Sequence, residues 1–198
     1  MQNQYEEARS KLEEALLIFI DLGGRFGTAH CLQHLGDILR MQDRYEEAQS
    51  KLEEAQSIFI DISARLEVAQ CLQSLAHILR VQNQHKEARL KLEEARLIFI
   101  DIDHRLGVAQ CLQSLGDMLR AQNHYEEAQS KREEAQSIFI DIGDRVGAAQ
   151  CLRSLGYILG MQKQYEQAQL RLEEARSIFI DLGDHLAAAQ CAERLDRV

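Results

Sequence analysis

The five cysteines are the side chains of this 198-residue chain with the greatest capacity for chemistry, and they recur at a fixed interval of 40 residues. They are Cys31, Cys71, Cys111, Cys151 and Cys191. Such a ladder could form disulfides or bind a metal. On stacked helix pairs, however, equivalent positions lie two helix spacings of about 8–10 Å apart, whereas a disulfide needs Cα atoms within about 7 Å. We therefore expect small, buried and unreactive thiols.

A pair of histidines offers a second possible chemistry. His30 and His34 are four residues apart, with Asp37 one turn further on, and this spacing on a helix can hold a transition metal. The pattern occurs in one repeat only, because the equivalents of His34 are serines, namely Ser74, Ser114 and Ser154. We expect surface or groove histidines, and we predict neither a metal nor another cofactor.

Catalytic motifs are missing from the sequence. It contains no nucleophile elbow, phosphate-binding loop, HExxH or paired CxxC pattern. Glu-Glu pairs recur in nearly every repeat, which indicates a solvated helix face rather than a general acid and base. We predict that the chain is not an enzyme.

The elements that position these side chains follow the same 40-residue period. The segment YEEA begins at Tyr5, Tyr45 and Tyr125, with variants at His85 and Tyr165, and IFID recurs in every copy. A period of this length indicates stacked supersecondary units that share a continuous core. We predict one solenoid domain over residues 1–198, made of five units: 1–40, 41–80, 81–120, 121–160 and 161–198.

Each unit is predicted to contain two helices, represented by residues 45–62 and 65–80. Apolar residues recur at spacings of three and four in both segments, as one face of a helix requires. The connections are short, which favours antiparallel hairpins. The chain has no proline, and helix-favouring residues dominate its composition. We predict an all-α fold of about ten helices.

Two details test this pattern. Asn3, Asp43, Asn83 and Asn123 precede the first helix of a unit by two residues, where we expect a left-handed turn residue, and Lys163 breaks that pattern. Arg132 replaces a core leucine, so we expect its guanidinium to extend outward to water and to leave a local weak point.

Composition excludes several other functions. The net charge is −9, which argues against general nucleic-acid binding because phosphate contacts need a basic surface. No apolar run approaches the roughly 20 residues of a membrane span, and the first residues do not resemble a signal peptide. We therefore expect no nucleic-acid partner, no membrane association and a cytoplasmic location.

The repeat resembles the tetratricopeptide family, whose signature is matched by Leu32, Leu35-Gly36 and Leu39, followed by Ala48, Leu52 and Ala55. The resemblance implies a right-handed α-solenoid of antiparallel helix hairpins. The 40-residue unit is similar to repeats of the LGN/Pins polarity scaffolds, of kinesin light chains and of fungal and bacterial STAND proteins. The near-identity of the five copies is consistent with recent duplication or with consensus design.

The resemblance also implies a concave groove lined by the helices that contain the cysteines. Glutamines in such a ladder could pair with the backbone of an extended peptide, and arginines could bind carboxylates. Alternatively, these are solvated faces with local ion pairs. Family members that clamp a chaperone carboxylate use lysine and asparagine, which this groove lacks. The candidate positions are Gln33, Asp37, Arg40, Gln70, Gln73, His77, Arg80, Gln110, Gln113, Asp117, Arg120, Gln150, Arg153 and Tyr157.

We therefore predict a protein-interaction scaffold that binds a peptide or helical segment of a protein partner. The alternative is a structural or self-assembling repeat array with no dedicated ligand. The first helix supports that alternative, because it keeps apolar residues where free-standing arrays carry a polar cap. This uncapped face indicates either an excerpt from a longer array or self-association through the helix, whose apolar residues are Leu12, Leu16, Leu17, Ile18, Phe19 and Ile20.

Overall fold

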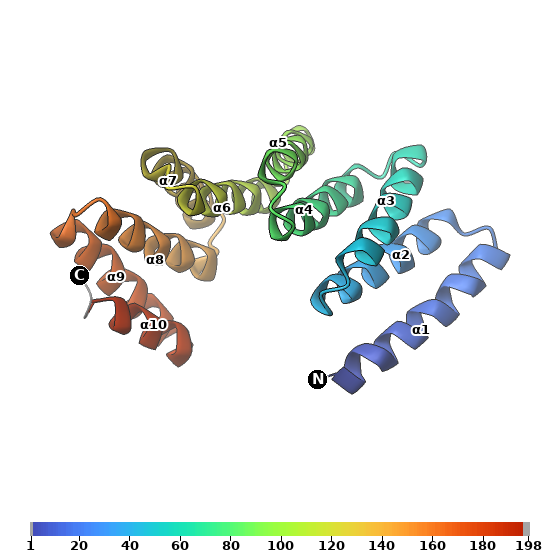
Figure 1. The fold of residues 1–198 in the computed structure, drawn as a ribbon, viewed down its shortest axis with the longest axis horizontal. Helices are drawn as coiled ribbons and strands as arrows, with labels where there is room; N and C mark the ends of the chain where they lie inside the picture. The colour runs from blue at the N-terminus through green and yellow to red at the C-terminus, as the bar shows by residue number, and fades with distance from the viewer. Residues whose placement is uncertain (1, 196–198) are drawn as a thin grey trace. The chain divides into compact units, whose positions relative to one another are not determined.

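The computed structural model describes the backbone of residues 2–195 and the side chains of residues 5–195. This part of the chain contains ten helices and no strand (Figure 1). The helices are α1 (Gln2–Asp21), α2 (Arg25–Met41), α3 (Tyr45–Asp61), α4 (Arg65–Val81), α5 (His85–Asp101), α6 (Arg105–Ala121), α7 (Tyr125–Asp141), α8 (Arg145–Met161), α9 (Tyr165–Asp181) and α10 (His185–Leu195).

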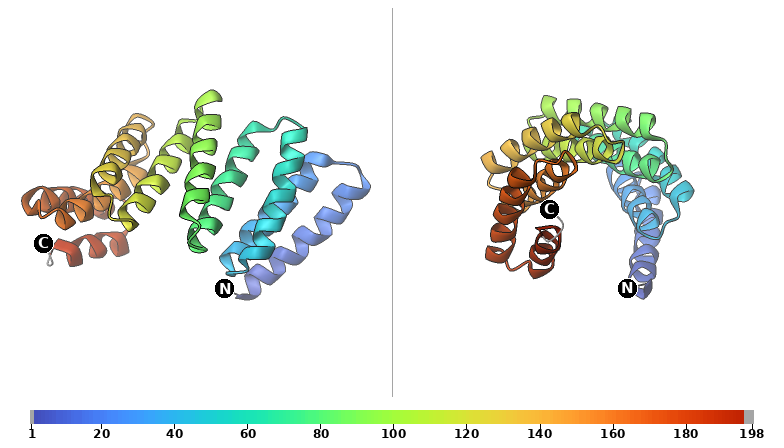
Figure 2. Two further views of the ribbon diagram at one scale, coloured as in Figure 1. Left: turned by 45° about the horizontal axis from the view of Figure 1, so that its top comes forward. Right: turned by 60° about the vertical axis from the view of Figure 1, so that its left-hand side comes forward.

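The chain divides into two compact units, Met1–Ile102 with α1 to α5 and Asp103–Val198 with α6 to α10. Within each unit, consecutive helices are joined by short turns and run antiparallel (Figure 2). We call α2, α4, α6, α8 and α10 the cysteine helices, and α1, α3, α5, α7 and α9 the acidic helices. The predicted all-α fold of helix hairpins is confirmed. That the five repeats form one domain stays a prediction.

The acidic helices bury one narrow stripe of side chains. In α3 this stripe is Ala48, Leu52, Ala55 and Phe59, which are all fully buried. Their spacings of four, three and four place them on one face. Burial of each phenylalanine or leucine contributes about 1.5–3 kcal/mol. The glutamates of these helices lie on the other side, in water.

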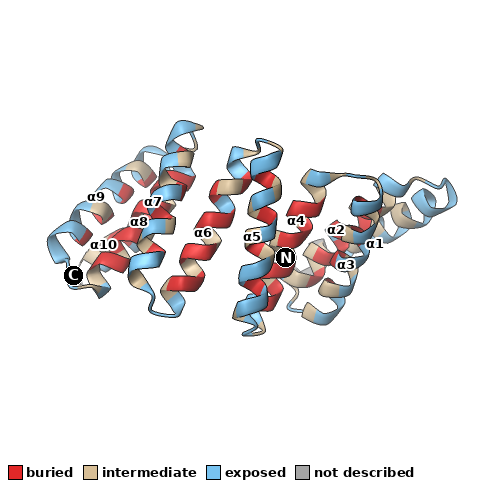
Figure 3. Ribbon diagram, turned by 90° about the horizontal axis from the view of Figure 1, so that it is seen from above, coloured by how far each residue is buried: buried red, intermediate tan, exposed pale blue. Residues whose placement is uncertain are grey.

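The cysteine helices are buried on two sides. Ala69, Leu72 and Leu75 of α4 pack on one side, and Cys71 and Ile78 are fully buried beside them. Figure 3 shows buried residues along these helices and exposed residues along most of α1. The α4 helix therefore lies between α3 and α5, and its remaining polar face is available for contacts outside the core.

The turns between helices depend on one left-handed residue each. After α2, Asp43 has φ 59° and donates its N–H to the carbonyl of Arg40, while the N–H of Arg44 reaches the carbonyl of Leu39. These two bonds satisfy carbonyls at the helix end, as in a Schellman cap. The same positive φ occurs at Asp43, Ser63, Asn83, Asp103, Asn123 and Lys163, and at Gly23, Gly143 and Gly183.

The predicted left-handed turn residue is confirmed at Asp43, Asn83 and Asn123, and Lys163 adopts the same conformation with φ 62°. Asn3 was a wrong prediction, because it lies inside α1, which begins at Gln2. A helical residue there has no chain reversal to accommodate.

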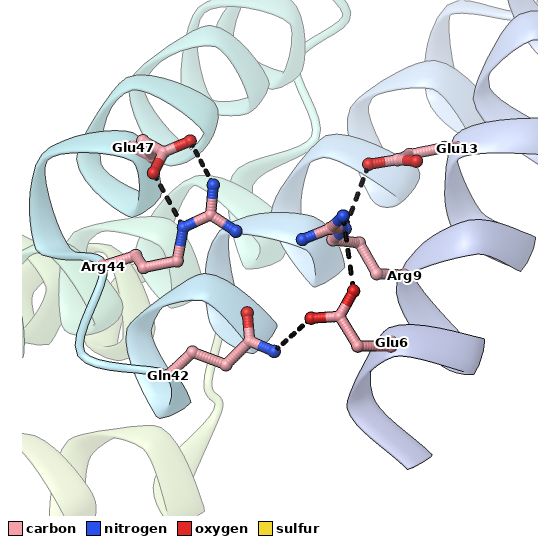
Figure 4. Close-up of polar contacts among 6 residues, drawn as sticks. All are labelled: Glu6, Arg9, Glu13, Gln42, Arg44 and Glu47. Atoms are coloured by element: carbon pink, nitrogen blue, oxygen red, sulfur yellow. Dashed lines mark hydrogen bonds and ion pairs between the residues drawn. The ribbon is translucent and has the colours of Figure 1, made fainter. Parts of the chain in front are cut away.

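Polar contacts link α1 to the following hairpin (Figure 4). Gln42, in the turn after α2, donates from Nε2 to Glu6 Oε1 at 3.2 Å, and Glu6 also pairs with Arg9 at 3.3 Å. Arg44 donates from Nε and Nη2 to both carboxylate oxygens of Glu47, at 2.7 and 2.6 Å. This contact lowers the pKa of the Glu47 carboxyl. All these contacts are exposed, so their contribution to stability is small.

Candidate functional site

Polar side chains of adjacent cysteine helices meet in pairs. In the first unit, Gln33 Nε2 donates to Gln70 Oε1 at 3.4 Å, and in the second unit Gln113 Nε2 donates to Gln150 Oε1 at 3.0 Å. Arg153 takes the next such place and donates to Gln190 Oε1 at 2.6 Å. The two predicted glutamine columns are therefore brought together within each unit.

In the first unit, Asp37 is the centre of a small polar group. Its Oδ1 accepts from Ser74 at 2.9 Å and lies 3.4 Å from Arg40 Nε. His77, near both Arg40 and Asp37, has a pKa lowered by burial first and then by Arg40 and Arg80. Asp37 is thus paired with Arg40, and Arg80 adds a second positive charge near His77. A local ion pair such as Arg40–Asp37 is what we expect if these positions form a solvated helix face rather than a binding groove.

In the second unit the equivalent residues form a pocket of about 350 Å³. Asp117, Arg120 and Tyr157 come from positions predicted for the groove. Arg120 lies 3.8 Å from Asp117 and 5.0 Å from the centre of the Tyr157 ring. The full lining is Gln113, Asp117, Arg120, Arg132, Gln150, Arg153, Ser154, Tyr157 and Arg194.

The remaining predicted groove positions lie outside this pocket. Gln33 is buried, Gln70 and Gln73 are half-buried, and Arg80 and Gln110 are exposed. Whether any of the fourteen residues contacts a partner stays a prediction.

Arg132 of α7 is where the sequence-based interpretation was wrong. Its side chain is only 3% exposed and does not extend outward to water. Instead, its Nη2 pairs with Asp117 of α6, and its Nη1 lies 4.0 Å from Cys151 Sγ. Gly116 lies against the Arg132 side chain, where an added Cβ would be 3.1 Å from its Cγ. A carboxylate on the neighbouring helix thus offers closer compensation than water.

Several residues of the surface were missed from the sequence. Ser154 and Arg194 line the pocket, and neither was among the positions predicted for the groove. Arginines that begin four of the cysteine helices also pair with aspartates 36 residues later, a register visible in the sequence. These exposed pairs are Arg25–Asp61 and Arg65–Asp101 at 2.7 Å, Arg105–Asp141 at 2.8 Å and Arg145–Asp181 at 3.2 Å.

All five cysteines are buried, as predicted. Burial is the main cause that raises the pKa of the Cys71 thiol to about 12, and it also raises the pKa of Cys31, Cys151 and Cys191. Protonated thiols are poor nucleophiles and poor metal ligands. The cysteines therefore act as small core residues.

The histidine pair has packing partners. His30 makes edge contacts with Phe26 and Phe59, at centroid distances of 4.5 and 5.2 Å, and its Nε2 is 3.9 Å from Glu67. His34 is exposed. Among the described residues, no three histidine, cysteine or acidic side chains are placed to hold a metal ion. Within the same residues, no helix is both long and apolar enough to cross a membrane.

A sequence model of the tetratricopeptide repeat matches residues 1–61 and 66–141. This chain belongs to the tetratricopeptide repeat family. The resemblance predicted from the leucine, glycine and alanine positions is thereby confirmed. No curated protein matches the tetratricopeptide chain in sequence.

Solved structures show the same fold at low identity. A STAND protein with a tetratricopeptide repeat sensor from Pyrococcus horikoshii is 18% identical, with a TM-score of 0.77 over 84% of this chain and 26% of that protein. Nearly identical repeats of a putative kinesin light chain from Podosopora anserina are 19% identical, with a TM-score of 0.70 over 92% and 90% of the two chains.

A third similar structure is a Rap protein complexed with competence and sporulation factor. It is 16% identical, with a TM-score of 0.71 over 98% of this chain and 58% of that protein. At these identities the likeness establishes the fold alone. The STAND and Rap proteins are considerably longer than the tetratricopeptide chain described here.

Proposed function

We propose that this tetratricopeptide chain is a protein-interaction scaffold whose cysteine helices bind a peptide or helical segment of a partner. The observation that carries the proposal is the pairing of Gln33 with Gln70 and of Gln113 with Gln150 across adjacent helices. Each pair uses one donor and one acceptor, while a glutamine side chain has further hydrogen-bonding capacity. The half-buried amides of Gln70, Gln113 and Gln150 can bind the peptide groups of an extended segment.

The similar Rap protein supports this reading by analogy. Its structure contains competence and sporulation factor, so the same fold accommodates a bound molecule in that protein. Polar columns without a catalytic group favour recognition over reaction in this chain as well.

The test is a selection of peptides by display on the full chain, followed by affinity measurement of the enriched peptides by fluorescence anisotropy. A triple variant replaces Arg40, Arg80 and Arg120 with alanine, on the proposed binding face. The matched control replaces Arg25, Arg65 and Arg105, which begin the same three helices and lie in exposed ion pairs.

We expect the first triple variant to weaken binding at least tenfold, because arginines on the binding face contribute charge-assisted hydrogen bonds. The control should stay close to the original affinity. No enriched peptide, or an equal loss in both variants, would contradict the proposal.

A second candidate function is a self-assembling array, and one observation favours it. Phe19 of α1 is 38% exposed, whereas its equivalents Phe59, Phe99, Phe139 and Phe179 are at most 2% exposed. An uncovered face of this kind can bind another repeat unit.

A further inference from the structure

The pocket of the second unit combines four positive charges with one negative charge. Arg120, Arg132, Arg153 and Arg194 come from four different helices, α6, α7, α8 and α10, and converge on a volume of about 350 Å³. Asp117 is the single carboxylate of the lining. The chain as a whole has a net charge of −9, so this concentration of positive charge is opposite to its general character.

Two of these guanidinium groups are held in place by an aromatic ring. The Tyr157 ring has Arg120 at 5.0 Å and Arg194 at 4.4 Å from its centre. Such cation–π contacts orient a guanidinium without neutralising it. Both groups therefore keep their charge for a ligand, although Arg120 also lies near Asp117.

Arg153 is held in the same way by uncharged groups. Its Nη1 donates to Gln190 Oε1 at 2.6 Å, and its guanidinium lies 5.5 Å from the centre of the Phe179 ring. The three preceding repeats carry glutamine at the equivalent position, namely Gln33, Gln73 and Gln113, and the fifth repeat carries Glu193. The positive charge at residue 153 is thus specific to this pocket.

The buried Arg132 completes the pocket and forms an ion pair with Asp117, the single carboxylate of the lining. Arg132 is 3% exposed and pairs with Asp117, while its Nε has no hydrogen-bond partner among the described residues. Asp117 is then shared between Arg132 and Arg120. Since one carboxylate cannot balance four guanidinium groups, the pocket has an excess of three positive charges.

The first unit provides an internal comparison. There, Leu52, Gln73 and His77 occupy the places of Arg132, Arg153 and Tyr157, and Arg40 is paired with Asp37. Arg132 and Arg153 thus add two guanidinium groups that the equivalent positions of the first unit lack, and the position equivalent to Arg194 carries a serine, Ser114.

We propose that this pocket binds the oxyanion of a side chain in a partner peptide, either a carboxylate or a phosphate monoester. This inference rests on the proposed peptide-binding function and specifies its ligand chemistry. Guanidinium groups present paired N–H donors that match the two oxygens of such an anion. The stacked and hydrogen-bonded arginines are already ordered, which reduces the entropic cost of binding.

The experiment measures fluorescence anisotropy of three labelled probes on the full chain. The probes are blocked peptides of equal length: one of glutamate, one of glutamine, and one of glycine with a central phosphoserine. The variant Arg153→Gln restores the residue of the three preceding repeats, and Arg132→Leu restores the residue of the four other repeats. Arg171→Gln is the control, because it removes the same charge from an exposed ion pair on α9.

We expect the glutamate or the phosphoserine probe to bind, and the glutamine probe to bind at least tenfold more weakly. The stronger of the two anionic probes identifies the source of the oxyanion. Arg153→Gln should weaken anion binding at least tenfold, and Arg171→Gln should change it less than twofold. Thermal unfolding of each variant verifies that the fold is intact.

Three results would overturn the inference: no anionic probe binds, the glutamine probe binds equally well, or Arg153→Gln has no more effect than the control. If peptides enriched by display still lose affinity when Arg40, Arg80 and Arg120 are replaced, the proposed function stands and only the oxyanion pocket fails. If no peptide is enriched and none of the probes binds, both proposals fail.

Discussion

Arg132 combines a cost in stability with a role in the pocket. Its guanidinium is buried, with Asp117 as an ion-pair partner and an Nε without a hydrogen bond. Removing an arginine from water costs several kcal/mol, which a single ion pair does not always repay. Leucine at the equivalent positions Leu52 and Leu172 is fully buried.

We predict that Arg132→Leu raises the free energy of unfolding by about 1–2 kcal/mol, because a leucine fills the same space without desolvating a charge. Asp117→Asn should instead lower it by about 1–2 kcal/mol, since it leaves a buried guanidinium unpaired. Urea denaturation of both single variants and of the double variant measures these values. A loss from Asp117→Asn that is equally large in the Arg132→Leu background would contradict the argument.

His77 makes the free energy of unfolding depend on pH in the first unit. Burial, Arg40 and Arg80 lower its pKa from the ordinary value of 6.5, and Asp37 opposes them. Between the lowered pKa and 6.5, the unfolded chain binds more protons than the folded one. The stability due to neutral His77 is therefore present above pH 6.5 and is lost as the pH falls through the lowered pKa.

We predict that the original chain loses stability between pH 7.5 and pH 5.5 through this residue, while His77→Gln reduces the loss. The urea denaturation midpoints of the original chain and of His77→Gln are compared at each pH. The carboxylates titrate in both proteins, so the difference between the two reports on His77. The variant His85→Gln serves as the control. An identical pH slope with and without His77 would contradict the assignment.

The helix ends show how one residue per turn determines the hairpin. Lys163 has φ 62° in the turn after α8, where Asp43, Asn83 and Asn123 occupy the other repeats. A lysine side chain makes a left-handed conformation unfavourable by about 1 kcal/mol, whereas glycine adopts it freely.

We predict that Lys163→Gly raises the free energy of unfolding by about 0.5–1 kcal/mol. The neighbouring Gln162 has φ −83°, so Gln162→Gly relieves no strain and should lower stability through the greater freedom of the unfolded chain. Thermal unfolding of the two variants tests the contrast. Equal shifts in the same direction would contradict it.

The elements themselves were largely predictable from the sequence. Segments predicted at residues 45–62 and 65–80 are Tyr45–Asp61 and Arg65–Val81 in the structure. Each copy repeats the same apolar spacing, so a pattern that is weak in one copy becomes clear over five. The agreement thus reflects local physical rules that every copy obeys.

The candidate pocket was predicted only in part, because it depends on departures from the repeat. Six lining residues follow from the register of the groove, whereas Arg132 belongs to an acidic helix; the six are Gln113, Asp117, Arg120, Gln150, Arg153 and Tyr157. Periodicity assigns a residue to a helix face, but not to the partner that its side chain reaches. The Asp117 contact needs the packing of α6 against α7, which one sequence does not supply.

At the scale of the whole chain, the uncovered face of α1 is the feature that differs most from the repeat pattern. The stripe of α3 is fully buried: Ala48, Leu52, Ala55 and Phe59. The centre of the Phe59 ring lies 6.0 Å from that of Phe26 and 5.2 Å from that of His30, both on α2. A preceding cysteine helix therefore helps to cover the stripe of an acidic helix. The corresponding residues of α1 are partly or largely exposed: Ala8, Leu12, Ala15 and Phe19.

A second copy of the chain can provide the missing cover. The α10 helix of one copy has the register of a cysteine helix, so its packing on α1 of another copy would extend the repeat from chain to chain.

We predict that the average mass, measured by light scattering, rises with concentration in the micromolar range. Ala8→Glu places a charge on the uncovered stripe and should keep the chain monomeric, because a buried unpaired carboxylate opposes the contact. Ser10→Glu adds the same charge at an exposed position of the same helix and should associate like the original chain. A monomeric original chain at high micromolar concentration, or equal behaviour of the two variants, would show that this stripe does not mediate assembly.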